Sequence, residues 1–204
     1  MKKIIVLFGF IMMTLLSTAQ KFDGGLFAGL STSQVDGDAQ GGYHRAGINA
    51  GVFVALPFNQ KWAGQFEIKY IQKGSYKGQN PDAGDYNTYG IKLHYIEMPL
   101  LAKFLYKPKI NFEAGLNFGY LAASKELFNG DPYPGAKPFR KYELSWGIGG
   151  SYQLLKNIAL NIRYSYSILP IRKHAGNAAY QNNRGQYNNV ITFSFYYKFG
   201  APNE

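Results

Sequence analysis

The 204-residue chain contains no cysteine. This absence excludes disulfide bonds, thiolate metal sites, a cysteine nucleophile and a lipid-modified N-terminal cysteine. Charged residues are scarce at 17%, below the roughly 25% that is usual in soluble domains. Beyond the N-terminal sixteen residues no run approaches the ~20 apolar residues of a membrane-spanning helix, and no long stretch has the 3.6-residue period of an amphipathic helix. The sequence therefore predicts neither membrane-spanning helices nor a helical domain.

The N-terminus has the pattern of an export signal. The positively charged Met1–Lys3 precedes an apolar run, Ile4–Leu16, and small residues then continue to Ala19. Such a run is short for a transmembrane helix, and no stop-transfer pattern follows it. We expect a signal peptide over residues 1–19, cleaved after Ala19, and one domain over residues 20–204; an uncleaved anchor is the alternative.

What is abundant favours β-structure, with 17 Tyr, 15 Phe and 24 Gly. In INFEAGLNFGY, residues 110–120, apolar and small or polar residues alternate strictly, so they point to opposite faces of a strand. The same alternation recurs over residues 48–56, 66–70, 142–152, 158–168 and 191–199. A Gly-rich stretch at 22–32 and a segment at 91–106 are less regular. We predict about eight strands, each near the 9–11 residues that cross a bilayer at a tilt.

The connections between these strands alternate in length. The short ones are Pro57–Lys61, Lys107–Lys109 and Leu155–Asn157, and the long ones are Ser33–Arg45, Tyr76–Gly90, Ala123–Arg140 and Leu169–Asn188. Tight turns at one end and large loops at the other are typical of an outer-membrane barrel, which has short periplasmic turns and longer extracellular loops.

The polar face of the strands distinguishes two kinds of barrel. A soluble lipocalin-like barrel turns its apolar face inward, and a membrane barrel turns it outward. The polar face here consists mainly of Gly, Ser, Asn and Ala, as at Gly115, Asn117, Ser145 and Ser165, which suits a narrow lumen better than a water-exposed exterior. The expected fold is therefore all-β: an eight-stranded antiparallel up-and-down transmembrane β-barrel in the cell outer membrane.

Several segments also resemble a known family. They are GGLFAGLSTS (24–33), FEIKYIQKGS (66–75), LHYIEMPLLAKF (93–104), EAGLNFGYL (113–121) and FSFYYKF (193–199). Together they look like the PorT-like small outer-membrane β-barrel family of Gram-negative bacteria. The resemblance implies an eight-stranded outer-membrane barrel and a link to protein secretion, and it supplies no catalytic motif.

Isolated charges on the polar face form the candidate site. We predict a lumen charge network of Glu67, Lys69, Glu97, Lys103, Glu113, Glu143, Arg163 and Lys198. Because an unpaired buried charge is costly, these groups should pair and form hydrogen bonds. Glu113 is expected to pair with Arg163 or Lys69. The network acts either as a packed polar plug, which the narrow lumen of eight strands favours, or as an ion path.

Other features give weaker signals. His44, His94 and His174, with Asp36, Asp38, Asp82 and Asp85 nearby, could form a metal or hydrolase site at the extracellular end; no HExxH-type spacing supports this, and the DGD at Asp36–Asp38 lacks the other calcium-loop positions. We therefore predict no enzyme activity, no cofactor and no metal. Pro99 should cause a bulge or a local break in pairing, which would explain an apparent change of strand parity near 95–99.

The expected partners follow from the location. A basic rim could meet lipopolysaccharide phosphates; it consists of Lys125, Lys137, Arg140, Arg172, Lys173 and Arg184. Outer-membrane lipid and lipopolysaccharide are thus predicted partners, and cell-envelope or secretion proteins are further candidates. Nucleic acid is not expected, because the barrel itself explains the basic, aromatic composition. The function predicted is a structural or interaction role; the alternatives are an enzyme at the outer leaflet or a narrow pore for ions or small solutes.

Overall fold

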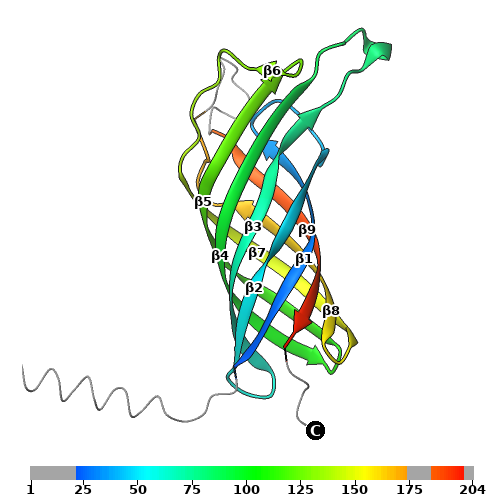
Figure 1. The fold of residues 1–204 in the computed structure, drawn as a ribbon, viewed down its shortest axis with the longest axis vertical. Helices are drawn as coiled ribbons and strands as arrows, with labels where there is room; N and C mark the ends of the chain where they lie inside the picture. Colours follow the sequence, from blue (N-terminus) through cyan, green and yellow to red (C-terminus); the bar gives the residue numbers. More distant parts are fainter. Residues whose placement is uncertain (1–21, 174–184, 200–204) are drawn as a thin grey trace, which may run out of the picture.

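The computed structural model describes residues 22–173 and 185–199. Eight long strands form a single tilted barrel (Figure 1), and a ninth strand, β6, is only two residues long. The elements are β1 (Asp23–Asp36), β2 (Arg45–Pro57), β3 (Trp62–Lys77), the 3-10 helix η1 (Pro81–Ala83), β4 (Tyr89–Lys107), β5 (Ile110–Phe128), β6 (Asp131–Pro132), β7 (Tyr142–Leu155), β8 (Ile158–Ser167) and β9 (Tyr187–Lys198). No helix among the described residues is long and apolar enough to cross a membrane.

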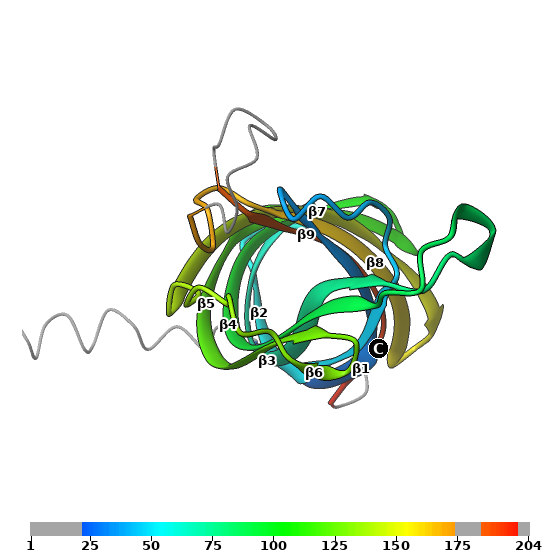
Figure 2. The same cartoon turned by 90° about the horizontal axis from the view of Figure 1, so that it is seen from above.

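Every long strand pairs with its two neighbours in antiparallel fashion. The sheet closes because β1 pairs with β9 from Gly25↔Lys198 to Asp36↔Tyr187, and the closed ring is visible from above in Figure 2. Closure leaves no free barrel edge, which is the condition for satisfying strand backbones in lipid. The predicted fold class is confirmed.

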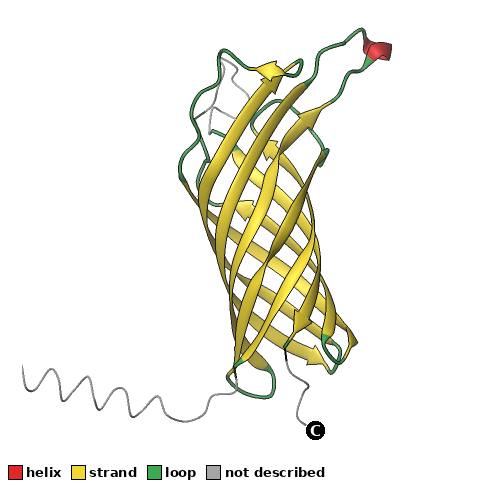
Figure 3. Ribbon diagram, viewed as in Figure 1, coloured by secondary structure: helices red, strands yellow, loops and turns green. Residues whose placement is uncertain are grey.

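The two ends of the barrel differ as predicted. The tight turns and the described ends of β1 and β9 lie at one end, and the long connections lie at the other (Figure 3). The strands are 10 to 19 residues long, so the expected length of 9–11 residues is too short for most of them. The excess is largest in β4 and β5, which at 19 residues each continue as a hairpin beyond the other strands on the long-loop side (Figure 1).

The outer surface is apolar, as a lipid-facing surface must be. Leu30 is 64% exposed, Leu100 59% and Phe195 59%. The alternate positions on these strands point inward and are buried, and many of them are polar. In residues 110–120, Phe112, Leu116 and Phe118 are exposed while Glu113 and Asn117 are buried, which matches the face assignment made from the sequence.

The predicted parity change near Pro99 is wrong. The buried positions of β4 run without a change of face through 91, 93, 95, 97, 99 and 101. What changes is their chemistry, from Ile91, Leu93 and Tyr95 on the extracellular side to Glu97 below. Pairing between β3 and β4 is interrupted opposite Pro99, but the register stays constant; the register shift lies at His94/Tyr95, on the other side of β4 where it pairs with β5.

Candidate functional site

Arg163 is the centre of a buried ion cluster at the middle of the lumen. Its guanidinium donates from Nη1 and Nη2 to the two carboxylate oxygens of Glu67, both at 2.8 Å, and from Nε to Glu113 at 2.7 Å. The three side chains come from β8, β3 and β5, and all are at most 4% exposed. The paired hydrogen bonds to Glu67 have the geometry that guanidinium and carboxylate favour. Together with the bond to Glu113, they fix the relative positions of three strands.

Polar neighbours complete this lower ion cluster. The Tyr196 hydroxyl donates to Glu67 at 2.9 Å, and Asn161 donates to Glu113 at 2.9 Å. Gln65 donates to Glu67 at 2.6 Å and accepts from Lys103 at 3.0 Å; Lys103 Nζ is also 3.8 Å from Glu113. Hydrogen bonds from neutral groups thus supplement the ion pairs, as buried charges require.

A second ion cluster lies nearer the extracellular side. Lys73 contacts both Glu97 and Glu143, with 3.1 Å between its Nζ and Glu143 Oε2, and Lys69 pairs with Glu97 at 3.2 Å. Lys73 Nζ also lies 4.9 Å from the centre of the Tyr95 ring. Ser167 and Asn188 donate further hydrogen bonds to Glu143. Each of the four charged side chains is at most 2% exposed, so this cluster is also closed to solvent.

The eight predicted lumen charges therefore divide into three groups. Glu67, Glu113, Arg163 and Lys103 meet in the lower cluster, and Lys69, Glu97 and Glu143 meet in the upper one. Glu113 pairs with Arg163 and not with Lys69. Lys198 lies apart from both clusters, because it pairs with Asp23 at 2.7 Å and both side chains are about one-third exposed.

Sequence reasoning missed Lys73, which joins Glu97 to Glu143. The signal was present, because Glu67, Lys69, Ile71 and Lys73 occupy alternate positions of β3 and are all buried. The regular apolar alternation on the opposite face of this strand ends at Tyr70, and Lys73 lies beyond it, next to Gly74. Extending the period by two more pairs of residues identifies it.

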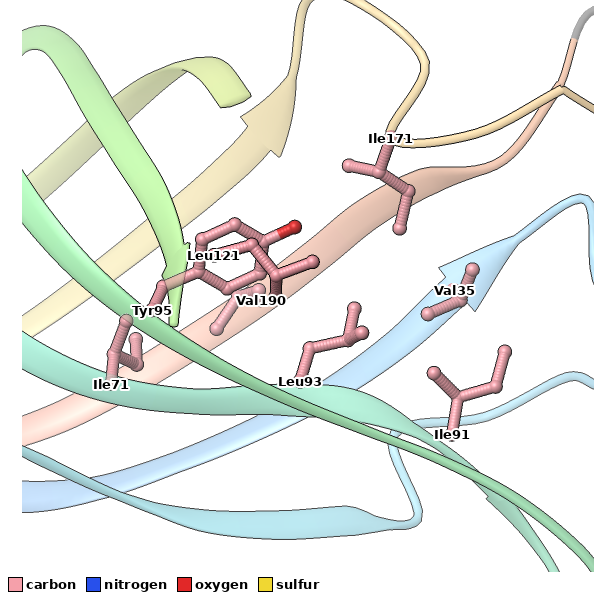
Figure 4. Packing of buried hydrophobic residues seen from close by; sticks show 8 residues of the cluster. All are labelled: Val35, Ile71, Ile91, Leu93, Tyr95, Leu121, Ile171 and Val190. Carbon is pink, nitrogen blue, oxygen red and sulfur yellow. The ribbon is translucent and has the colours of Figure 1, made fainter. Parts of the chain in front are cut away.

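An apolar plug (Figure 4) adjoins the upper cluster on the extracellular side through Tyr95, whose ring lies close to Lys73. Its eight side chains are all at most 2% exposed; they are Val35, Ile71, Ile91, Leu93, Tyr95, Leu121, Ile171 and Val190. Ile171 belongs to the connection after β8, so this extracellular segment enters the barrel mouth.

A second apolar layer lies on the periplasmic side. Phe27 stacks on Tyr196 with 4.5 Å between ring centres, and Phe53 lies against the same ring at 5.4 Å. These inward-facing aromatics differ from the expectation that large aromatic side chains face lipid. Phe53 fits because Gly25 on β1 carries no side chain; a Cβ there would overlap the Phe53 ring. Below this layer, a cavity of about 300 Å³ opens to the periplasmic end between Gln65, Lys103 and Lys198.

The extracellular mouth contains a further buried ion pair. Arg172 donates to both oxygens of Glu126, at 2.6 and 2.9 Å, and lies over the Phe139 ring at 4.1 Å. Burial alone would lower the pKa of Arg172, but the hydrogen bonds and charge of Glu126 outweigh it and raise the pKa. Arg172 was expected on a solvated basic rim; it is instead 2% exposed and ties the β8–β9 connection to β5. Of the other rim residues, Lys125, Lys137, Arg140 and Lys173 are exposed, and Arg184 lies outside the described residues.

The acidic loop residues serve as local structure. Burial raises the pKa of Asp38 to about 6, although hydrogen bonds from Ser75 and the Gln40 amide act in the opposite direction. A hydrogen bond from Lys77, whose Nζ is 2.5 Å from Asp85, lowers the pKa of Asp85. Asp38 therefore ties the β1–β2 loop to β3, and Asp85 ties the β3–β4 loop to its own base.

The histidines do not form a common site in the described part of the chain. His94 faces outward on β4 and its Nδ1 is 2.5 Å from the Tyr70 hydroxyl, whereas His44 lies in the β1–β2 loop; His174 lies outside the described residues. Within residues 22–173 and 185–199, no group of three or more His, Asp or Glu side chains could hold a metal ion.

Comparison with known proteins agrees with this geometry. The attachment invasion locus protein Ail of Yersinia pestis superposes with a TM-score of 0.55 at 16% identity, over 88% of this chain and 99% of Ail. Neisserial surface protein A superposes with a TM-score of 0.52 at 15% identity, over 87% of this chain and 97% of the neisserial protein. At these identities the likeness concerns the fold. No curated protein sequence matches the chain.

The sequence itself matches a family model. Residues 18–172 match the model described as "Outer membrane protein beta-barrel domain", which is well over half of the 204 residues. The match includes seven of the eight long strands, β1 to β5, β7 and β8. The chain is therefore a small β-barrel protein that belongs to the outer membrane protein beta-barrel domain family.

Proposed function

We propose that this protein is a non-conducting outer-membrane barrel whose role is structural or interactive and is exercised at its extracellular end. The observation that carries the proposal is the filled lumen. Two buried ion clusters lie between an aromatic layer and an eight-residue apolar plug. A pore needs a continuous wetted path, and eight strands enclose a space that side chains fill.

The extracellular end offers the surface for such a role. The β3–β4 connection, residues 78–88, projects away from the barrel (Figures 1 and 2). It is folded on itself by the Asn80↔Asp85 bridge and by the ion pair of Lys77 with Asp85. Tyr86 in this loop is 65% exposed, and exposed tyrosines on ordered loops are favourable contact residues in protein interfaces.

Three finer assignments belong to the same proposal. The segments YIQKGS and YIEMPLLAKF support placement among PorT-like barrels, and with it an accessory role in secretion or surface binding. The charge and length pattern of residues 1–19 supports a cleaved signal peptide. The sealed lumen gives a substrate no access to the buried carboxylates, which supports a non-enzymatic role. Cell-envelope proteins and lipopolysaccharide are the proposed partners.

Replacement of the β3–β4 loop tests the interactive role. Lys77 and Tyr89 are direct cross-strand partners, so an Asn-Gly turn can replace residues 78–88 and close the hairpin without disturbing the barrel. We expect this variant to fold and to lose proteins that the wild type captures by cross-linking in intact cells. Folding is measured by heat-modifiable gel migration, and capture by affinity purification after cross-linking.

The matched control replaces residues 58–62, which are the periplasmic turn and Trp62, the first residue of β3. Pro57 and Ala63 are also direct partners, so the same Asn-Gly insertion can be made at the opposite end. This control should keep every captured protein. Equal capture by both variants, or no capture by the wild type, would contradict an interactive role of the extracellular loop.

A further inference from the structure

Two lysines face each other on the outer surface of the barrel. Lys92 on β4 and Lys125 on β5 are direct cross-strand partners, so their side chains leave the sheet on the same face. That face is the outer one, because Ile91 and Leu93 on either side of Lys92 are 0% exposed and Glu126 beside Lys125 is buried in the mouth. Lys125 itself is exposed.

This arrangement is unfavourable for the protein alone. Like charges directly opposite each other on neighbouring strands destabilise a sheet. Among the described residues, no carboxylate forms an ion pair with either lysine, whereas Lys69, Lys73, Lys77 and Lys198 each have one. A bridging anion would remove the repulsion and gain two charge-assisted contacts.

The neighbouring residues include a histidine on the same face and no competing side chain on β3 opposite Lys92. On β3, the residue opposite Lys92 is Gly74, which has no side chain. Two positions along β4, His94 lies on the same outer face. Gln72 donates to the Tyr70 hydroxyl at 2.9 Å, and that hydroxyl is 2.5 Å from His94 Nδ1. This hydrogen bond engages Nδ1, so Nε2 is the ring nitrogen that remains for contact with a bound anion.

The lysine pair also lies at the level of lipid headgroups. The outward residues of β4 below His94 are apolar, beginning with Ile96 at 40% exposure, and Tyr120 on β5 is 45% exposed. Lys92 is four residues beyond Ile96, which is about 13 Å along a strand and about 9 Å along the membrane normal at the usual tilt. The pair thus lies just outside the apolar band on the extracellular side, where outer-leaflet phosphates are found.

We propose that Lys92 and Lys125, flanked by His94, bind a phosphate group of a lipopolysaccharide molecule in the outer leaflet. The site orients the lipid by its phosphate while the acyl chains lie along the apolar strip of β4 and β5 below. The repulsion between the two lysines is tolerated because the lipid is present in the native membrane. This inference rests on the proposed partnership with lipopolysaccharide and gives that partnership a site.

Titration with lipid A tests the site. The purified barrel in a neutral detergent is mixed with increasing lipid A, and the thermal unfolding midpoint is followed by heat-modifiable gel migration. Lipid A should raise the midpoint of the wild type. Lys92→Ala/Lys125→Ala should need about 25-fold more lipid A for half of that rise, from the usual contribution of a basic residue near an anionic lipid surface. Lys125→Ala alone should need about 5-fold more.

The controls distinguish recognition of the lipid phosphate at this site from a general effect of charge or of lipid. Lys107→Ala/Lys109→Ala removes the same charge at the periplasmic end and should respond as the wild type does. Without lipid A, the Lys92/Lys125 double variant should be at least as stable as the wild type, because repulsion is removed.

Two kinds of failure are distinguishable. If lipid A does not stabilise the wild type at all, the proposed partnership with lipopolysaccharide fails together with its site. If the double variant and the wild type respond equally, the site alone is overturned. The site is also overturned if dephosphorylated lipid A, or inorganic phosphate at the same concentration, stabilises the wild type as well as lipid A does.

Discussion

Replacement of Arg163 by methionine is expected to lower the free energy of unfolding by about 3–5 kcal/mol, the usual cost of removing one partner from a buried ion pair. The change leaves the carboxylates of Glu67 and Glu113 buried without the guanidinium that contacts both. Tyr196, Gln65 and Asn161 can still donate hydrogen bonds. Lys103, at 3.8 Å from Glu113, is the one cation left in the cluster and cannot replace the close contacts of Arg163 with both carboxylates. Urea unfolding of the barrel in lipid vesicles, followed by the fluorescence of its two tryptophans, measures the change.

Two further variants establish the cause. Lys198→Met breaks the pair with Asp23, in which both side chains are about one-third exposed, and should cost no more than about 1 kcal/mol. The triple variant Glu67→Gln/Glu113→Gln/Arg163→Met removes the guanidinium together with the two carboxylates that it contacts and leaves only the partly exposed Lys103 charged. It should recover most of the lost stability, because no carboxylate is left without its cation. A loss below about 1 kcal/mol for Arg163→Met would show that the lower cluster does not stabilise the barrel.

Alanine at Gly74 is expected to destabilise the barrel by about 3 kcal/mol, which combines backbone strain and overpacking. Gly74 lies inside β3 with φ of +140°, a conformation that L side chains rarely adopt. A Cβ there would also overlap the backbone carbonyl of Ile91 on β4. The strand cannot move away, because Lys73 and Ser75 on either side are buried and hydrogen-bonded in the lumen and mouth. The same urea measurement applies.

Gly90→Ala is the matched control for this variant. Gly90 lies on β4 close to Gly74 and is also buried, but a Cβ at this position would meet its nearest atom, in Tyr76, at an ordinary 3.5 Å. Its cost should therefore be within about 1 kcal/mol, the general penalty or gain of exchanging glycine for alanine. Equal losses at both positions would refute the special role of the Gly74 conformation.

The fold could be predicted because the information is local and repeated. The alternation in INFEAGLNFGY assigns each residue to a face, and small residues such as Gly115 and Asn117 identify the inner one. The rhythm of short and long connections then gives the topology. The pattern did not predict how apolar and charged layers follow one another along the barrel axis. A period of two residues assigns a side chain to a face of the sheet, but it does not give its position along the axis.

That limitation explains the errors in particular elements. The apparent parity change in β4 was a change from an apolar to a charged layer, from Tyr95 to Glu97, on one unbroken inner face. Phe27 and Phe53 face inward because the lumen has an aromatic layer near its periplasmic end. Arg172 is buried because its loop folds into the mouth, and no local pattern predicts how a long loop returns.

The ion clusters could be predicted as a set but not as pairs. Alternation places Glu67, Glu113 and Arg163 in the lumen, and closure of the barrel brings strands β3, β5 and β8 within reach of one another. The pairing of each carboxylate with a cation depends on the stagger of the strands. In this barrel Glu113 pairs with Arg163, and Glu97 pairs with Lys69. Lys198 was misplaced because its depth, close to the end of β9, determines its partner.

Single-channel recording in planar lipid bilayers tests the central claim, a sealed lumen, most directly. The wild-type barrel should show no conductance steps at either polarity. Heat-modifiable migration of the same protein sample verifies that the barrel is folded. Regular, reproducible steps from the wild type would contradict the account, because they would require a wetted path through both ion clusters and the apolar plug.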